Sequence, residues 1–134
     1  IIPARGQIIL TEPIENLKLK GTFHYDEGYY YFRNLGNRIL LGGARNQDFE
    51  KEETTDFETT EFLQNHLEQF LKEVILPNQE FKIAMRWSGI MAMGNEKTPI
   101  VKQLSERQFC AVRLSGMGVA LAPKIGEMVC ELVF

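Results

Sequence analysis

Two glycines near the C-terminus stand between an apolar run and an amphipathic segment, and this stretch has the clearest chemical potential. Ser115-Gly116-Met117-Gly118 follows the apolar run 109–114 and precedes residues 119–133. Glycine tolerates a positive φ and lets a ligand approach the backbone closely. Because the first amides of a helix have no intrahelical acceptors, a strand, glycine turn and helix in this order suit binding of a phosphate or a polarised carbonyl oxygen.

A dinucleotide-binding fingerprint is the first interpretation to test for such a turn. The fingerprint needs a third glycine at the position of Leu121, where this chain has a bulky apolar side chain. We therefore favour a glycine turn that joins a strand to a helix.

The composition is typical of one globular domain with its own core. The chain has 134 residues, of which 44% are hydrophobic and 25% charged. Its net charge of −3, without a basic stripe, argues against nucleic acid or an anionic membrane surface as a partner. The sequence shows neither a signal peptide nor an apolar run of transmembrane length.

The two cysteines lie in apolar segments and lack metal-site spacing. We expect Cys110 and Cys130 to be buried, reduced thiols in a cytoplasmic protein, and we expect no metal site. A chain that begins with Ile1 instead of methionine suggests a piece of a longer protein.

The remaining pattern predicts strands and one long helix that would position the turn. A Gly36-Asn37 turn links two of these strands into a hairpin. The predicted strands are 6–14, 29–33, 38–42, 81–93, 99–101 and 109–114. Hairpin-linked strands around one helix indicate an α+β fold: a mostly antiparallel sheet, one long helix packed on it and a C-terminal strand–glycine turn–helix.

The long helix is predicted from apolar residues at steps of three and four. They are Phe62, Leu63, His66, Leu67, Phe70, Leu71, Val74 and Ile75. Thr55 and Glu58 have the spacing of a capping box before it, and Pro77 ends it. We interpret His66 as a hydrogen-bonded core residue, and the acidic loop 46–56 as solvated surface without a function.

Aromatic side chains alternate along the first strand of the hairpin. Tyr29, Tyr31 and Arg33 share one face, whereas Tyr30 and Phe32 share the other. The tyrosines belong either to the sheet core or to a wall that faces a ligand. Gly89, inside another strand, suggests a bulge or the close approach of another group.

Four segments, in order along nearly the whole chain, resemble the FAD-dependent D-amino-acid-oxidase-like oxidoreductases. This family includes enzymes that oxidise glycine, sarcosine and glycerol 3-phosphate. The segments are Pro3-Ala4-Arg5-Gly6-Gln7, the hairpin 29–43, Trp87-Ser88-Gly89-Ile90-Met91 with Pro99-Ile100, and 115–127.

The resemblance implies a piece of a flavoprotein with non-covalently bound FAD. The N-terminal FAD-binding domain would be absent, residues 1–104 would form the substrate side, and 105–134 would join the missing domain. The residues implied to face the flavin are Gly89, Ile90, Gly116, Met117, Gly118, Val119 and Ala120. Those implied to contact the substrate are Tyr29, Tyr31, Arg33 and Met91.

The departures from the family pattern restrict the expected substrate. Met91 stands where amino-acid oxidases of this family carry an arginine, and methionine cannot bind a carboxylate bidentately. Arg86 falls on the opposite face of the strand. The resemblance then implies oxidation of an amine, amino acid or hydroxy compound by hydride transfer to FAD, with no general base assigned. The chain alone would be inactive.

A stand-alone α+β binding or assembly module without catalysis is the alternative function. In the flavoprotein interpretation, the apolar face of the last helix would pack on the absent domain and cause self-association when bare. That face comprises Leu121, Ile125, Val129 and Leu132.

Overall fold

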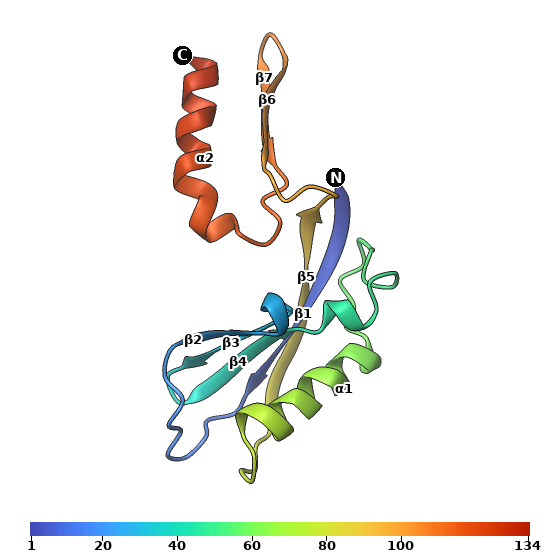
Figure 1. Ribbon diagram of the computed structural model, residues 1–134, viewed down its shortest axis with the longest axis vertical. Coiled ribbons are helices and arrows are strands. Elements are labelled where there is room, and N and C mark those ends of the chain that lie inside the picture. Colours follow the sequence, from blue (N-terminus) through green and yellow to red (C-terminus); the bar gives the residue numbers. More distant parts are fainter. The chain divides into compact units, whose positions relative to one another are not determined.

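The computed structural model describes residues 1–134 and contains two compact units, which are described separately (Figure 1). The larger unit comprises Arg5–Ile90, and the smaller one comprises Ile1–Ala4 with Met91–Phe134. The predicted α+β class is confirmed, because the sheets are mainly antiparallel and carry two principal helices. Among the helices, none combines the length and the apolar character that a membrane span requires.

A five-stranded sheet forms the framework of the larger unit, in the order β2-β3-β4-β1-β5. Its strands are β1 (Ile2–Thr11), β2 (Thr22–Tyr25), β3 (Tyr30–Leu35), β4 (Arg38–Gly43) and β5 (Ile83–Met93). The antiparallel register places Phe32 opposite Leu41, and Leu41 opposite Ile9. Short 3₁₀ turns at Asp26–Gly28 and Arg45–Gln47 precede β3 and follow β4.

Helix α1 (Glu61–Phe70), continued by a π turn at Leu71–Ile75, packs on one face of this sheet. Ile9, Leu41 and Leu67 are fully buried between the two layers, and burial of each such side chain stabilises the fold by about 1.5–3 kcal/mol. The ring of Tyr30 stacks on Phe70 with centroids 4.4 Å apart. Tyr30 and Phe32 therefore belong to the core, on the face opposite Tyr31 and Arg33.

The start of α1 differs from the prediction. The cap is Thr60, whose hydroxyl accepts a hydrogen bond from the Leu63 amide, so the Thr55–Glu58 capping box is wrong. The apolar face is also narrower than predicted, since Phe62 and Val74 are about half exposed. His66 is half-buried against the ring of Phe62, with centroids 4.7 Å apart, and is not a hydrogen-bonded core residue.

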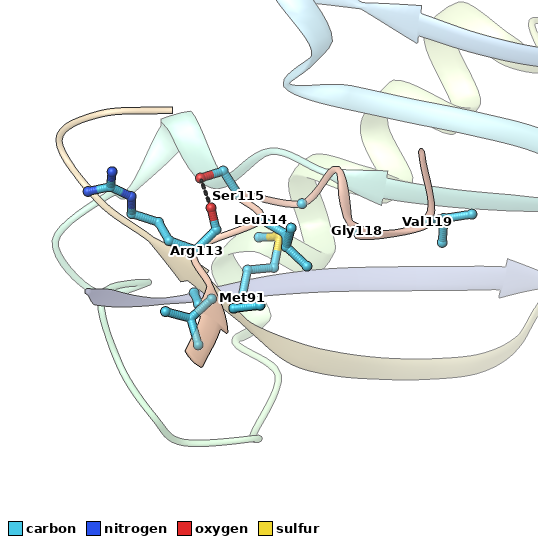
Figure 2. A pocket seen from close by; sticks show the side chains of 10 residues that line it. Met91, Arg113, Leu114, Ser115, Gly118 and Val119 are labelled. Atoms are coloured by element: carbon cyan, nitrogen blue, oxygen red, sulfur yellow. Dashed lines mark hydrogen bonds between the residues drawn. The ribbon is translucent and has the colours of Figure 1, made fainter. Parts of the chain in front are cut away.

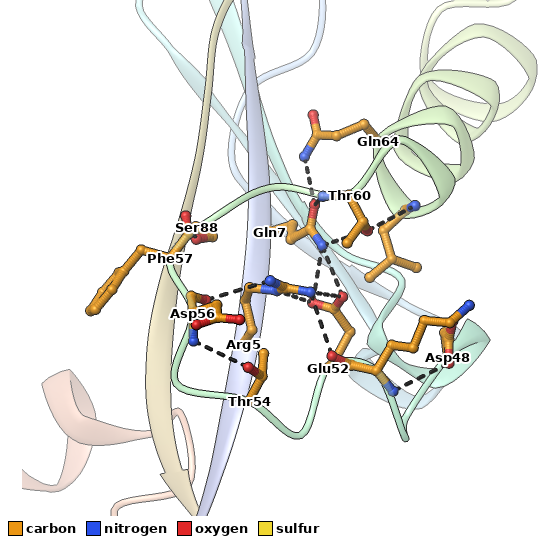
Figure 3. Close-up of polar contacts among 12 residues, drawn as sticks. Arg5, Gln7, Asp48, Glu52, Thr54, Asp56, Phe57, Thr60, Gln64 and Ser88 are labelled. Carbon is orange, nitrogen blue, oxygen red and sulfur yellow. Dashed lines mark hydrogen bonds and ion pairs between the residues drawn. The ribbon is translucent and has the colours of Figure 1, made fainter.

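The acidic loop was wrongly interpreted as wholly solvated, because Glu52 is one of the most buried side chains (Figure 3). Its carboxylate accepts hydrogen bonds from Arg5 Nε at 2.9 Å and from Arg5 Nη2 at 2.7 Å. Gln7 Nε2 donates to both carboxylate oxygens at 3.0 Å and to Thr60 Oγ1 at 2.9 Å. The Arg-Gly-Gln motif of β1 therefore holds the loop to the sheet and to the start of α1.

The smaller unit contains a hairpin of β6 (Ile100–Ser105) and β7 (Gln108–Val112), followed by helix α2 (Gly118–Val133). Ile125 is buried within the unit, where α2 lies along the hairpin, whereas Leu132 of the same predicted face is 42% exposed. Packing of this face on an absent domain stays a prediction. The prediction of buried thiols is also wrong, because Cys110 is only half-buried and Cys130 is exposed.

Several boundaries differ from the sequence-based expectation for identifiable reasons. β1 begins at Ile2 instead of residue 6, and the fully exposed edge strand β2 was not predicted. β6 continues to Ser105, beyond the predicted end at Val101. β7 stops at Val112 because the next residue, Arg113, has a φ of +62°, which no strand accommodates.

Candidate flavin-facing turn

A shallow hollow of about 440 Å³ lies in the smaller unit, between the end of β5, the end of β7 and the start of α2 (Figure 2). Its lining is mostly apolar and includes four residues that the sequence analysis singled out: Met91, Gly116, Gly118 and Val119. Three residues predicted to face a flavin therefore line one hollow with Met91, which was predicted to contact the substrate. Their contact with either ligand stays a prediction. Met117 and Ala120 lie beside it, as the cap and in the first turn of α2, but do not line it.

The turn between β7 and α2 has an unusual backbone. Arg113, Ser115 and Gly116 have φ values of +62°, +50° and +81°, and such angles in non-glycine residues are uncommon. The Ser115 amide donates to the carbonyl of Ala92 at 3.3 Å, and the Met117 amide donates to Leu114 at 2.8 Å. These bonds tie the turn to the end of β5 and hold it in this conformation.

Gly116 lies beside Met91 in the lining of the hollow. A Cβ atom at Gly116 would lie 3.4 Å from Met91 Sδ and would need a positive φ. A side chain at position 116 would be strained and would fill the approach to Met91. Glycine here keeps the backbone accessible.

The N-terminus of α2 has donors without partners inside the smaller unit. No side chain caps the helix at Met117, and the unit provides no acceptor for the amides of Gly118 and Val119. Val119 is 98% exposed. The partial positive charge of the helix end therefore acts at the edge of the hollow, where it would stabilise an oxygen that carries negative charge.

Arg113 is the charged residue of the lining, and its guanidinium already has partners. Nε donates to the carbonyl of Thr98 at 2.8 Å, and Nη2 pairs with Glu96 Oε2 at 3.1 Å. Gly94 leaves room for this side chain, since a Cβ there would lie 2.6 Å from Arg113 Cδ. The sequence analysis did not single out Arg113. Its positive φ and its contacts with Thr98 and Glu96 are visible only in the structure.

Gly89 and Ile90 lie on β5 in the larger unit. A Cβ atom built at Gly89 has no neighbour within 4 Å, so the packing of this chain does not require glycine at that position. A glycine in a strand interior often marks a bulge or the close approach of another group.

The three remaining predicted residues also belong to the larger unit, and they have different surroundings. The Tyr31 ring lies directly over Gly42, and burial raises the pKa of its hydroxyl. Arg33 is exposed and donates to the carbonyl of Asn34 at 3.3 Å. Tyr29 precedes β3 and packs edge-on against Phe49, with centroids 5.9 Å apart. Their contact with a substrate stays a prediction.

The family model described as "FAD dependent oxidoreductase" (DAO) matches residues 1–132. The chain belongs to this family. Among solved structures, L-proline dehydrogenase from P. horikoshii is similar, with a TM-score of 0.80 and 24% sequence identity, which shows a shared fold. The similarity covers 99% of this chain but 36% of that one, so the chain spans about a third of the length of its structural relative. No curated protein sequence matches significantly.

Proposed function

We propose that this chain is the substrate-side part of a larger flavoenzyme that oxidises a C–N or C–O bond in an amine, amino acid or related compound. The membership of the FAD-dependent oxidoreductase family supports flavin chemistry. The observation that carries the proposal is the glycine turn, where backbone amides without acceptors border an apolar hollow.

The residues of the turn fit a flavin. Gly116 leaves the backbone accessible, and the amides of Gly118 and Val119 are free to donate to a ring oxygen. Together with Met117 and Ala120 they would hold the pyrimidine edge of the ring, and Gly89 and Ile90 would pass close to it. A bound FAD supplies the chemistry by accepting a hydride from the substrate.

The chain itself contributes binding, orientation and electrostatics. Negative charge accumulates at the pyrimidine edge of a flavin as the flavin is reduced, and the N-terminus of α2 would stabilise that charge without reorganising. The mostly apolar lining around Met91 would offer an apolar contact surface to a ligand. No residue is assigned as a general base.

The lining of the hollow bears on the substrate class. Met91 offers no charge, and the guanidinium of Arg113 is occupied by Glu96 and Thr98. The lining of the hollow therefore has no free cation for a substrate carboxylate. Arg33 or the hydroxyl groups of Tyr29 and Tyr31, on the larger unit, would have to bind a carboxylate if the substrate carries one.

The FAD-binding domain would be supplied by sequence outside these residues, and the division near residue 104 remains part of this proposal. To test the proposal, this chain would be expressed together with its adjoining sequence. The visible absorbance of bound FAD would be measured, and peroxide formation and dye reduction would be assayed. The substrate panel would contain L-proline, sarcosine, other amines and hydroxy acids. A yellow protein with turnover would support the flavoenzyme, whereas a colourless protein that never binds FAD would favour the stand-alone binding module.

A further inference from the structure

A chain of polar contacts reaches one face of β5 from the buried Arg5–Glu52 pair (Figure 3). Gln7 joins Glu52 to Gln64 of α1, with Gln64 Nε2 donating to Gln7 Oε1 at 3.1 Å. Gln64 in turn accepts from Arg86 Nη1 on β5 at 2.8 Å. The second nitrogen of that guanidinium, Nη2, pairs with Glu68 at 2.5 Å.

The same buried pair also reaches β5 by a second route. Arg5 Nη1 contacts the carbonyl of Asp56 at 3.5 Å, in the segment that connects Glu52 with Thr60. The next carbonyl in this segment, that of Phe57, accepts a hydrogen bond from Ser88 Oγ at 2.5 Å. Arg86 and Ser88 of β5 are therefore both hydrogen-bonded to groups that are themselves connected, by further hydrogen bonds or along the adjoining backbone, to the Arg5–Glu52 pair.

Arg86 and Ser88 lie on the same face of β5, because side chains in a strand alternate between faces. Gly89 has the opposite orientation, and a Cβ atom there would meet nothing within 4 Å. β5 is therefore fixed by hydrogen bonds on one face and is bare at Gly89 on the other. With one face fixed by hydrogen bonds and the other open at Gly89, β5 is suited to pack against a flat ligand at a fixed distance.

We propose that Arg86 and Ser88 are positioning residues, which fix the backbone at Gly89 and Ile90 against the flavin through their contacts with Gln64, Glu68 and the Phe57 carbonyl. The flavin part of this inference rests on the proposed function. Neither side chain would touch the cofactor. Their loss would let the strand shift, and a misplacement of about 1 Å caused by a change far from the reacting atoms can slow an enzyme about 100-fold.

The test uses the full-length protein with bound FAD and two pairs of variants. Ser88→Ala removes the bond to Phe57, and Ser88→Thr restores a hydroxyl at the same place. Glu68→Gln weakens the pair with Arg86, whereas Glu73→Gln makes the same change at an exposed site whose contact is with Gln69. Flavin content, melting temperature, the visible circular dichroism of the flavin and amide hydrogen exchange would be measured for each.

At equal flavin content, we expect Ser88→Ala and Glu68→Gln to alter the visible circular dichroism and to speed amide exchange at residues 89–90. Ser88→Thr and Glu73→Gln should match the wild type in both measurements. The inference is overturned if Ser88→Ala and Glu68→Gln also match the wild type in both measurements. If Ser88→Ala folds poorly, Glu68→Gln still provides the test, because Glu68 is on the surface. A colourless wild type would refute the proposed function instead, and amide exchange would then still decide whether these residues fix the strand.

Discussion

The buried pair between Arg5 and Glu52 gives the sharpest prediction for stability. Glu52 is 1% exposed and Arg5 is 5% exposed. Glu52→Ala removes the two short hydrogen bonds to the guanidinium and leaves its remaining contacts, to the carbonyls of Lys51 and Asp56, at 3.5 Å. Those long contacts are too weak to compensate a buried charge. Breaking a buried pair by deleting one partner costs about 3–5 kcal/mol, a large part of the stability of a small domain.

The assay is urea unfolding of the 134-residue chain followed by circular dichroism. An exposed pair in the same loop provides the matched control: Lys51 Nζ lies 3.0 Å from Asp48, and Lys51→Ala should cost less than about 1 kcal/mol. The double variant Arg5→Met with Glu52→Leu should recover most of the loss, because it leaves no unpaired charge. A cost below about 1 kcal/mol for Glu52→Ala would refute the argument that the pair is desolvated.

Three further predictions follow from the same structure. Gly94→Ala should destabilise the chain by about 1–3 kcal/mol, because the new Cβ meets the Arg113 side chain, whereas Gly89→Ala should be nearly neutral in urea unfolding; equal costs would contradict this. Burial raises the pKa of Tyr31, so its contribution to stability is present below about pH 10 and is lost as the pH rises through the raised pKa; Tyr31→Phe should unfold at higher pH in an alkaline titration, and an unchanged midpoint would count against it. The exposed apolar residues of α2 and the C-terminus, including Val119, should make the isolated chain self-associate, which a constant monomer mass in light scattering across concentrations would exclude.

The sequence predicted the parts of the fold that depend on local pattern. The hairpin of β3 and β4 follows from its turn residues, and the separation of Tyr30 from Tyr31 follows from strand alternation. The edge strand β2 lacked such a signal, because all four of its residues are exposed and show no buried face.

The misassigned polar residues share a different cause. Glu52 sits in a run of charges that resembles a solvated loop, and only its long-range partner Arg5, 47 positions earlier, explains its burial. Arg113 escaped notice for the same reason, since its carbonyl partner Thr98 lies across the hairpin. The glycine turn itself was predictable, because Gly116 and Gly118 lie two positions apart in the sequence and their conformational freedom is a local property.

The affinity of the full-length protein for FAD, compared between the wild type and Gly116→Val, tests the central claim most directly. A valine at this φ of +81° is strained, and its Cβ would lie 3.4 Å from Met91 Sδ. Gly36→Val is the matched control, because Gly36 also has a positive φ, of +61°, and a Cβ there meets nothing within 4 Å, in a hairpin turn that the account does not place at the flavin. The account predicts a yellow wild type and control, and a Gly116→Val protein that is folded but binds FAD at least about tenfold more weakly. Equal FAD affinity in all three proteins, or no FAD binding by the wild type, would contradict it.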